Sequence, residues 1–126
     1  MSLISGTIRA ELTRAYSASD RHYHNLTHIE ALLALAQEHS AALSDREAVE
    51  AAIWFHDAVY DTRRHDNEAR SAELAAEQLR GQADEQRIEL IATMIGATAG
   101  HALPDFSDDG AKRDCALFLD MDLAVL

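Results

Sequence analysis

The chain has 126 residues, enough for one domain that buries roughly two-thirds of its unfolded surface. Its formal net charge is −11 and it contains a single lysine, which disfavours electrostatic binding to nucleic acid or to an anionic membrane. With no apolar stretch of about twenty residues, no signal-peptide features at its start and one cysteine, Cys115, the chain is expected to be cytoplasmic, without a membrane span or an internal disulfide.

The sequence pattern predicts an all-α fold, a compact bundle of about six helices in a single domain over residues 1–126. Alanine and leucine are abundant, β-branched residues are sparse, Pro104 is the only proline, and no run alternates with period two. Apolar residues recur at helical spacing. We expect helices over about 5–17, 27–39, 44–60 and 67–79, a fifth ending near Gly100 and a sixth from Ala111.

Three of these helices carry boundary signals. Thr27 and Ser44 each begin a capping box, because a glutamate follows three residues later, and they are expected to cap the second and third helices. Asp66 or Asn67 can cap the fourth helix, and Gly81 is suited to end it.

The most apolar stretch, residues 51–60, contains one adjacent polar pair, His56 and Asp57. A helix this apolar is expected to be buried on most of its faces. Burying such polar groups without partners costs at least about 2 kcal/mol each. Either the two side chains satisfy each other or nearby backbone groups, or a bound cation is their partner.

Further residues that could carry chemistry are His24 and His28 near the start of the second helix, His101 after the fifth, and Asp120 and Asp122 in the sixth. His28 falls in a first turn, where the helix dipole disfavours the imidazolium and keeps the ring available as a ligand, whereas His24 is expected to lie outside the helix. Asp120 and Asp122 are about 200° apart around a helix, so they cannot both face one ion. Without cysteine pairs, this set suits Mn, Fe, Co, Ni or Mg better than structural zinc.

In order along the chain, His28, the pair His56-Asp57 and Asp122 form the pattern H…HD…D. This pattern on an all-α core resembles the HD-domain superfamily of metal-dependent phosphohydrolases. More narrowly, over roughly residues 16–126, the chain is similar to a group of bacterial predicted HD phosphohydrolases without an assigned substrate. The strings that carry this similarity are Arg21-His-Tyr-His-Asn25, Ile53-Trp-Phe-His-Asp57, Asp66-Asn-Glu68 with Ser71-Ala72, and Phe118-Leu-Asp-Met-Asp-Leu-Ala124.

The resemblance implies that His28, His56, Asp57 and Asp122 bind a divalent metal ion, and it favours Asp122 over Asp120. It also implies hydrolysis of a phosphate monoester or nucleotide by a metal-activated water, with Asp57 placed to accept a hydrogen bond from that water. The ion would offset the negative charge of the chain around a small phosphorylated substrate.

Residues that follow the HD pair have a functional and a structural interpretation. Asp66 and Glu68 either act in catalysis or water positioning, or serve only as cap and first-turn acids. Arg63 and Arg64 either clamp phosphate oxygens or remain exposed loop residues.

Four other residues have alternative places in the fold. His24 and His101 either border the substrate pocket or are loop histidines. Trp54 and Cys115 lie in apolar helical patterns, so we expect both in the core, with Cys115 a structural thiol rather than a nucleophile.

Two other functional classes are kept as alternatives. HD-type sites also include di-iron oxygenases and hydratases, and a metal-stabilised domain without catalytic activity would bind a ligand or mediate assembly. Finally, the sequence stops at Leu126 within an apolar run, which predicts either a native chain that continues or a surface covered by a partner such as a second copy. Size-exclusion chromatography at several concentrations tests the second possibility.

Overall fold

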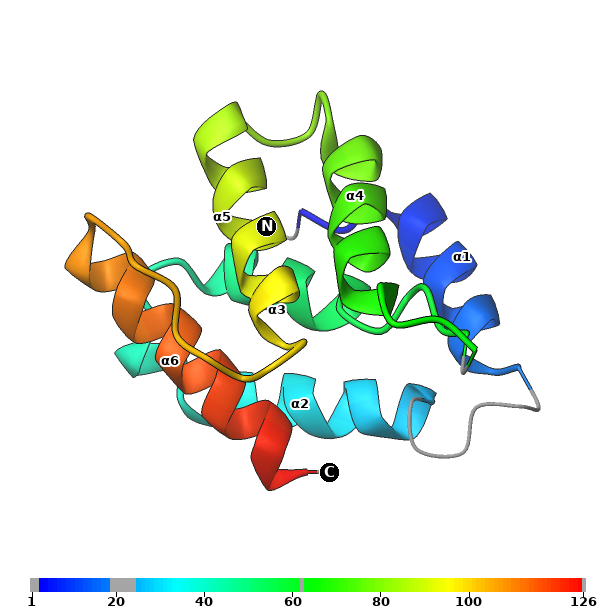
Figure 1. Cartoon of the computed structure of the whole chain (residues 1–126), viewed down its shortest axis with the longest axis horizontal. Coiled ribbons are helices and arrows are strands. Elements are labelled where there is room, and N and C mark those ends of the chain that lie inside the picture. The colour runs from blue at the N-terminus through cyan, green and yellow to red at the C-terminus, as the bar shows by residue number, and fades with distance from the viewer. Residues whose placement is uncertain (1–2, 19–24, 62, 126) are drawn as a thin grey trace.

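The computed structural model describes residues 3–18, 25–61 and 63–125. Within these ranges the chain forms six α-helices and one short 3-10 helix, with no strand, so the predicted all-α class is confirmed (Figure 1). The elements are α1 (Gly6–Tyr16), α2 (Leu26–Glu38), η1 (Ser40–Ala42), α3 (Arg46–Phe55), α4 (Asn67–Leu79), α5 (Glu85–Ala97) and α6 (Asp109–Ala124).

The helix α3 lies at the centre of the bundle, between the pair α4 and α5 on one side and α2 on the other (Figure 1). From Ala48 to Phe55 every residue except Glu50 is buried, which explains why its sequence is a nearly continuous apolar run. Trp54 is part of this core, as predicted. A fully surrounded helix is a rigid support for residues placed at its end.

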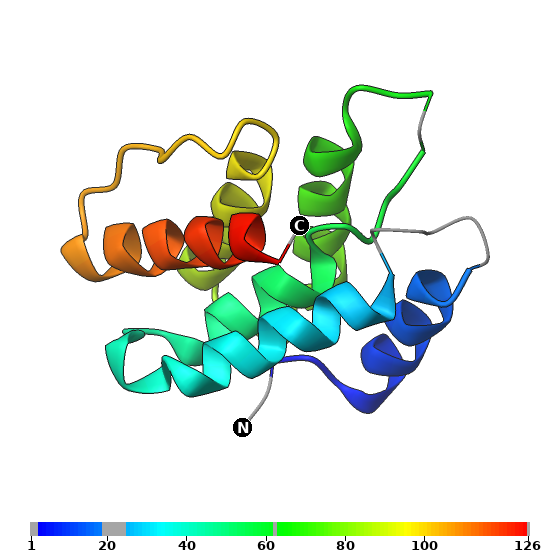
Figure 2. The ribbon, with the colours of Figure 1, turned by 90° about the horizontal axis from the view of Figure 1, so that it is seen from below.

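The helices α2 and α6 pack against each other and both contact α3. Figure 2 shows the start of α2 and the end of α6 converging near the end of α3. Segments far apart in the sequence therefore meet at one point, and this point holds the candidate site.

The helix α4 packs along α5, and the two form a hairpin (Figure 1). Asp66 precedes α4 as expected, although its side chain makes no capping hydrogen bond to the helix. At the other end, Gly81 adopts φ 89°, a left-handed conformation that glycine tolerates better than other residues. The turn after α4 therefore depends on this glycine.

The predicted caps of two helices were wrong. Asn25, rather than Thr27, caps α2, and Asp45, rather than Ser44, caps α3; each side chain accepts a hydrogen bond of 3.2 Å from the amide three residues later. Asparagine and aspartate rank at or above serine and threonine as N-caps, so each helix begins at the stronger of two nearby candidates.

The predicted end of α3 was also wrong: the helix stops before His56 instead of continuing to Tyr60. Two side chains occupy the carbonyls that a longer helix would have used. The carbonyl of Ile53 accepts from His56 Nδ1 at 2.7 Å, and the carbonyl of Trp54 accepts from the hydroxyl of Tyr16 at 2.7 Å. His56 therefore sits on the last turn, and the residues after it leave the helix.

Two other boundaries shift by a few residues. The helix α5 ends at Ala97 instead of Gly100, and the hydroxyl of the buried Thr98 donates to a carbonyl of its last turn at 2.6 Å. The helix α6 begins directly after Asp108, earlier than the expected Ala111, because the Asp108 carboxylate accepts from the amide of Ala111 at 2.8 Å.

Candidate metal centre

His56 provides the deepest group of the site. Its ring is 1% exposed, and its Nδ1 donates to the carbonyl of Ile53 at the end of α3. This bond fixes the orientation of the ring, and in the neutral imidazole it leaves Nε2 as an acceptor. Nε2 is buried and makes no hydrogen bond to any described residue. A buried nitrogen in this state can be satisfied by a proton that pairs it with a nearby carboxylate or by a metal ion.

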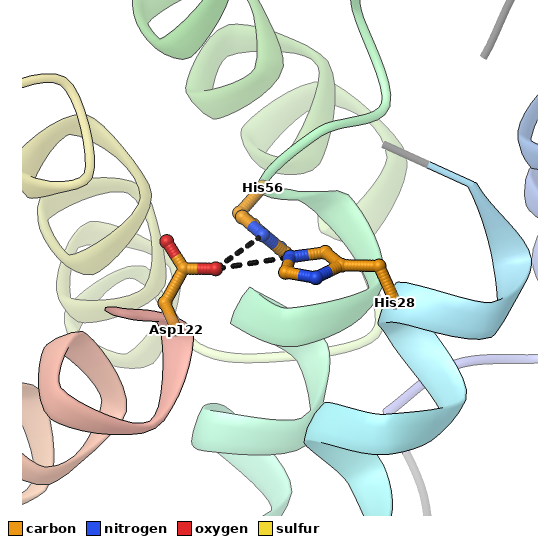
Figure 3. Close-up of side chains that lie close together, drawn as sticks. All are labelled: His28, His56 and Asp122. Atoms are coloured by element: carbon orange, nitrogen blue, oxygen red, sulfur yellow. Dashed lines mark hydrogen bonds and ion pairs between the residues drawn. The ribbon is translucent and has the colours of Figure 1, made fainter. Parts of the chain in front are cut away.

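Asp122 and His28 face this nitrogen from the other two helices (Figure 3). Oδ1 of Asp122, near the end of α6, lies 3.3 Å from His56 Nε2 and 3.0 Å from His28 Nε2. His28 lies in the first turn of α2, as predicted, and both it and Asp122 are buried. Asp120, the alternative acid, is exposed on another face of α6.

Asp57 adds a second carboxylate on the solvent side. Its Oδ2 lies 3.3 Å from His56 Nε2 and 3.8 Å from His28 Nε2, while its side chain is 17% exposed. His56 still has helical dihedral angles, φ −62° and ψ −28°, yet the Asp57 carboxylate reaches the nitrogens of both His56 and His28. The adjacent pair can therefore face the same point.

The backbone of Asp57 is held by α1. The amide of Asp57 donates to the hydroxyl of Tyr16 at 3.2 Å, while that hydroxyl donates to the carbonyl of Trp54. Tyr16 is 1% exposed. One buried hydroxyl thus ends α3 and positions the HD pair, a role that the sequence analysis did not assign to Tyr16.

Two polar residues of α4 hold the segment that follows. The hydroxyl of Ser71 accepts from the amide of Val59 at 3.0 Å, and Asn67 bonds both the amide and the carbonyl of Asp61, at 3.2 and 2.9 Å. Both residues occur in the strings that resemble HD phosphohydrolases, but the sequence predicted only a possible helix cap for Asn67 and no role for Ser71. Their contacts are with the backbone, so they act by shaping the segment beside the site.

The two carboxylates of the cluster favour a positive charge between them. Burial alone would lower the pKa of His56, but the carboxylates of Asp122 and Asp57 raise it to about 10. Burial alone would raise the pKa of Asp122, but its hydrogen bond with His28 and the nearby His56 ring hold that pKa well below its ordinary value. A proton on His56 supplies that charge in the protein alone, and a metal ion is the alternative.

The arrangement fits a metal ion. One ligand atom from each of His28, His56 and Asp122 can be chosen so that all lie within 4.8 Å of one another. Nitrogen and oxygen bind first-row ions at about 2.1 Å, so ligands at right angles are about 3 Å apart. The separations of 3.0 and 3.3 Å from Asp122 Oδ1 match that spacing. With Asp57, the donor set is two imidazoles and two carboxylates, which would balance the charge of a divalent ion.

His101 also reaches this cluster. It lies between α5 and α6, and its Nε2 is 2.7 Å from Oδ2 of Asp122, the oxygen that faces away from the other histidines. From the sequence, His101 was expected either to border the substrate pocket or to be a solvent-exposed loop histidine. Its side chain is 21% exposed, so it touches the cluster and solvent at once.

The other predicted site residues have partners of their own or lie further along the chain. Arg63 bonds Asp61 at 3.2 Å, and Arg64 bonds Asp66 at 2.8 Å, both on the exposed segment before α4. Glu68 is half-buried in the first turn of α4. The contacts seen for these side chains do not join the histidine cluster. His24 lies outside the described residues.

A surface hollow of about 570 Å³ lies between the start of α5 and the segment before α6. Arg87, Leu90 and Phe106 are among its lining residues, but none of the clustered histidines or aspartates is. The exposed edges of Asp57 and His101 therefore mark the approach to the candidate metal centre better than this hollow does.

Comparison of the chain with protein-family models, with curated proteins and with solved structures finds no match. Among the described residues, no helix is long and apolar enough to cross a membrane. The interpretation of the site therefore depends on its own geometry and on the sequence motifs.

Proposed function

We propose that this protein is a metal-dependent phosphohydrolase of the HD type, acting on a phosphate monoester or a nucleotide. The observation that carries the proposal is the buried Nε2 of His56, which lacks a hydrogen-bond partner among the described residues and lies 3.3 Å from a carboxylate oxygen of both Asp57 and Asp122. His28 completes the set, and the order of the four residues along the chain is the one that the HD resemblance implies.

The four residues would hold Mn, Fe, Co, Ni or Mg, all of which accept imidazole or carboxylate ligands. Such an ion, when bound, lowers the pKa of a coordinated water towards neutrality and polarises a phosphoryl oxygen. This would reconcile an anionic substrate with a chain of net charge −11.

The protein's own residues would do three things. His56 and His28 present nitrogens from rigid helix ends, which fixes the position of the centre. Asp57, the partly exposed carboxylate, accepts a hydrogen bond from the attacking water and orients it. Tyr16 keeps Asp57 in place through its backbone amide.

The segment before α4 would contribute to substrate binding. Arg63 is 88% exposed on its side chain, so its pair with Asp61 is screened by water and can exchange for a phosphate oxygen at little cost. Arg64 and Asp66 form a similar exposed pair. A catalytic role for Asp66 or Glu68 stays a prediction from the resemblance.

To test this, the protein is first stripped of metal with a chelator and then titrated with Mn²⁺, Co²⁺, Ni²⁺, Fe²⁺ and Mg²⁺. Binding is measured by calorimetry, and the bound metal is determined by elemental analysis. His56→Gln and Asp122→Asn are compared with His39→Gln, which changes an exposed histidine at the far end of α2. We expect tight binding in the native protein and His39→Gln and loss in the other two variants. Circular dichroism checks that each variant is folded.

The ions that bind are then used in a screen of p-nitrophenyl phosphate and nucleotides. Hydrolysis that requires the ion and is lost in Asp57→Asn supports the proposal. Binding of no ion by the folded native protein would overturn it. Ion binding without turnover would favour a non-catalytic metal-stabilised domain, and two bound irons with visible charge-transfer absorption would favour an oxygenase. The cytoplasmic location and any homo-oligomer likewise stay predictions.

A further inference from the structure

We propose that His101 is a positioning residue for Asp122. It donates a hydrogen bond to Oδ2, so that Oδ1 alone is presented to the metal ion. This inference rests on the metal centre proposed above. It concerns how the carboxylate is held rather than which residues bind the ion.

The direction of the hydrogen bond follows from the charges. An aspartate that binds a metal ion does so as the carboxylate, which offers only acceptor oxygens. His101 Nε2 must therefore donate to Oδ2. A separation of 2.7 Å is at the short end of the range for hydrogen bonds to a charged acceptor, which are roughly twice as strong as neutral ones.

The two oxygens of Asp122 have separate neighbours. Oδ1 is 3.0 Å from His28 Nε2 and 3.3 Å from His56 Nε2, whereas Oδ2 is 2.7 Å from His101 Nε2. A donor that occupies one carboxylate oxygen favours metal binding through the other oxygen. One-oxygen binding leaves a coordination position open that two-oxygen binding would close, and that position is available to water or substrate.

The backbone of His101 is consistent with a specific requirement for this side chain. Its φ is 51°, and among the described residues no other non-glycine residue has a positive φ. This left-handed conformation costs a non-glycine residue about 1 kcal/mol or more. The neighbouring Gly100 would adopt it more easily, yet the chain places the histidine there, and the short bond to Asp122 offsets the cost.

The experiment uses Co²⁺ bound to the full chain, because its visible spectrum reports the number and kind of ligands. His101→Phe keeps a ring but removes the donor, His101→Gln keeps a donor at the place of Nε2, and His39→Phe is the matched exposed control. We expect His101→Phe to bind Co²⁺ about 10- to 100-fold more weakly and with an altered spectrum, as is usual when the hydrogen-bond partner of a ligand is lost. His101→Gln should recover most of the affinity and the native spectrum.

Each result decides a different question. Native affinity and spectrum in His101→Phe would overturn the positioning role while leaving the metal centre intact. Equal impairment of the Phe and Gln variants would also overturn it, because the ring rather than the donor would then matter. If the native protein fails to bind Co²⁺ and the other ions titrated, the metal centre itself is refuted.

Discussion

Tyr16→Phe tests whether one hydroxyl links the core to the site. In the native protein this hydroxyl donates to the Trp54 carbonyl at 2.7 Å and accepts from the Asp57 amide at 3.2 Å. Phenylalanine keeps the packing of the ring but leaves both backbone groups without this partner. A buried group that loses its partner costs about 1–3 kcal/mol, and because the Asp57 amide is only partly buried we expect a loss near the low end for the pair, about 2–3 kcal/mol.

For a chain of 126 residues, 1 kcal/mol corresponds to about 3–5 °C in melting temperature, so Tyr16→Phe should melt about 6–15 °C lower. Thermal unfolding followed by circular dichroism measures this shift. Ser17→Ala is the control, because it removes an exposed hydroxyl bond to Thr13 from the end of the same helix and should change stability by less than about 0.5 kcal/mol.

Metal affinity provides a second measurement on the same variant. Because the Asp57 amide is no longer held, Tyr16→Phe should also bind the ion more weakly at temperatures where it is fully folded. A melting temperature within 1–2 °C of the native value, roughly the effect expected of the exposed control, would refute the assigned role of Tyr16.

Three further predictions follow from polar and reactive groups of the core. Asp114→Ala should destabilise the protein by about 2–4 kcal/mol in chemical unfolding, because the buried carboxylate accepts from the amides of Ser44 and Asp45 at 2.8 Å each. The control Asp109→Ala, on the exposed side of the same helix, should cost less than half as much. Burial tends to raise the pKa of Asp45, but its bonds with Arg87 hold that pKa below 3.8. The stabilisation of the folded protein by the Asp45–Arg87 pair is therefore present above about pH 4 and is lost as the pH falls further. Asp45→Asn, which keeps a capping side chain, should therefore be about 1 kcal/mol less stable than the native protein at pH 7 and nearly equal to it near pH 2; a constant difference would contradict this. Burial raises the pKa of the Cys115 thiol to about 11, so iodoacetamide at pH 7 should label the protein only after unfolding, and rapid labelling of the folded protein would show that the thiol is accessible.

The fold could be predicted from the sequence where burial of apolar side chains alone decides the structure. The apolar run that became α3 had no other stable environment than the centre of the bundle, and the prediction of a buried Trp54 followed from the same pattern. Helix boundaries were less accurate where adjacent residues compete for one role. Asn25 and Thr27 can both cap α2, and the sequence alone does not show which amide each side chain reaches.

The end of α3 could not be predicted from local sequence. It depends on the hydroxyl of Tyr16, which lies 38 residues from Trp54 in the chain. Asp114 is a similar case: an acid in an amphipathic helix ordinarily faces solvent, and its two amide partners lie about 70 residues away. Both contacts belong to tertiary structure and leave no periodic signal.

The site was predicted to the extent that spacing and helical geometry allow. The sequence pattern singled out His28, His56, Asp57 and Asp122, and the structure brings these four side chains together. The contact of His101 with Asp122 was not foreseen, because it depends on a loop whose backbone takes a left-handed conformation at one position.

The bond between His28 and Asp122 joins residues separated by 94 positions in the sequence. The candidate site therefore forms only when distant parts of the chain have come together. No local fragment can assemble it, because each of the three helices contributes a part that the others lack. If the proposed ion binds there, its binding is coupled to global folding, and free ion at 100 times its dissociation constant would add about 2.7 kcal/mol to the stability of the native state. Slow hydrogen exchange in α2, α3 and α6 should then follow ion concentration together, as a single cooperative unit.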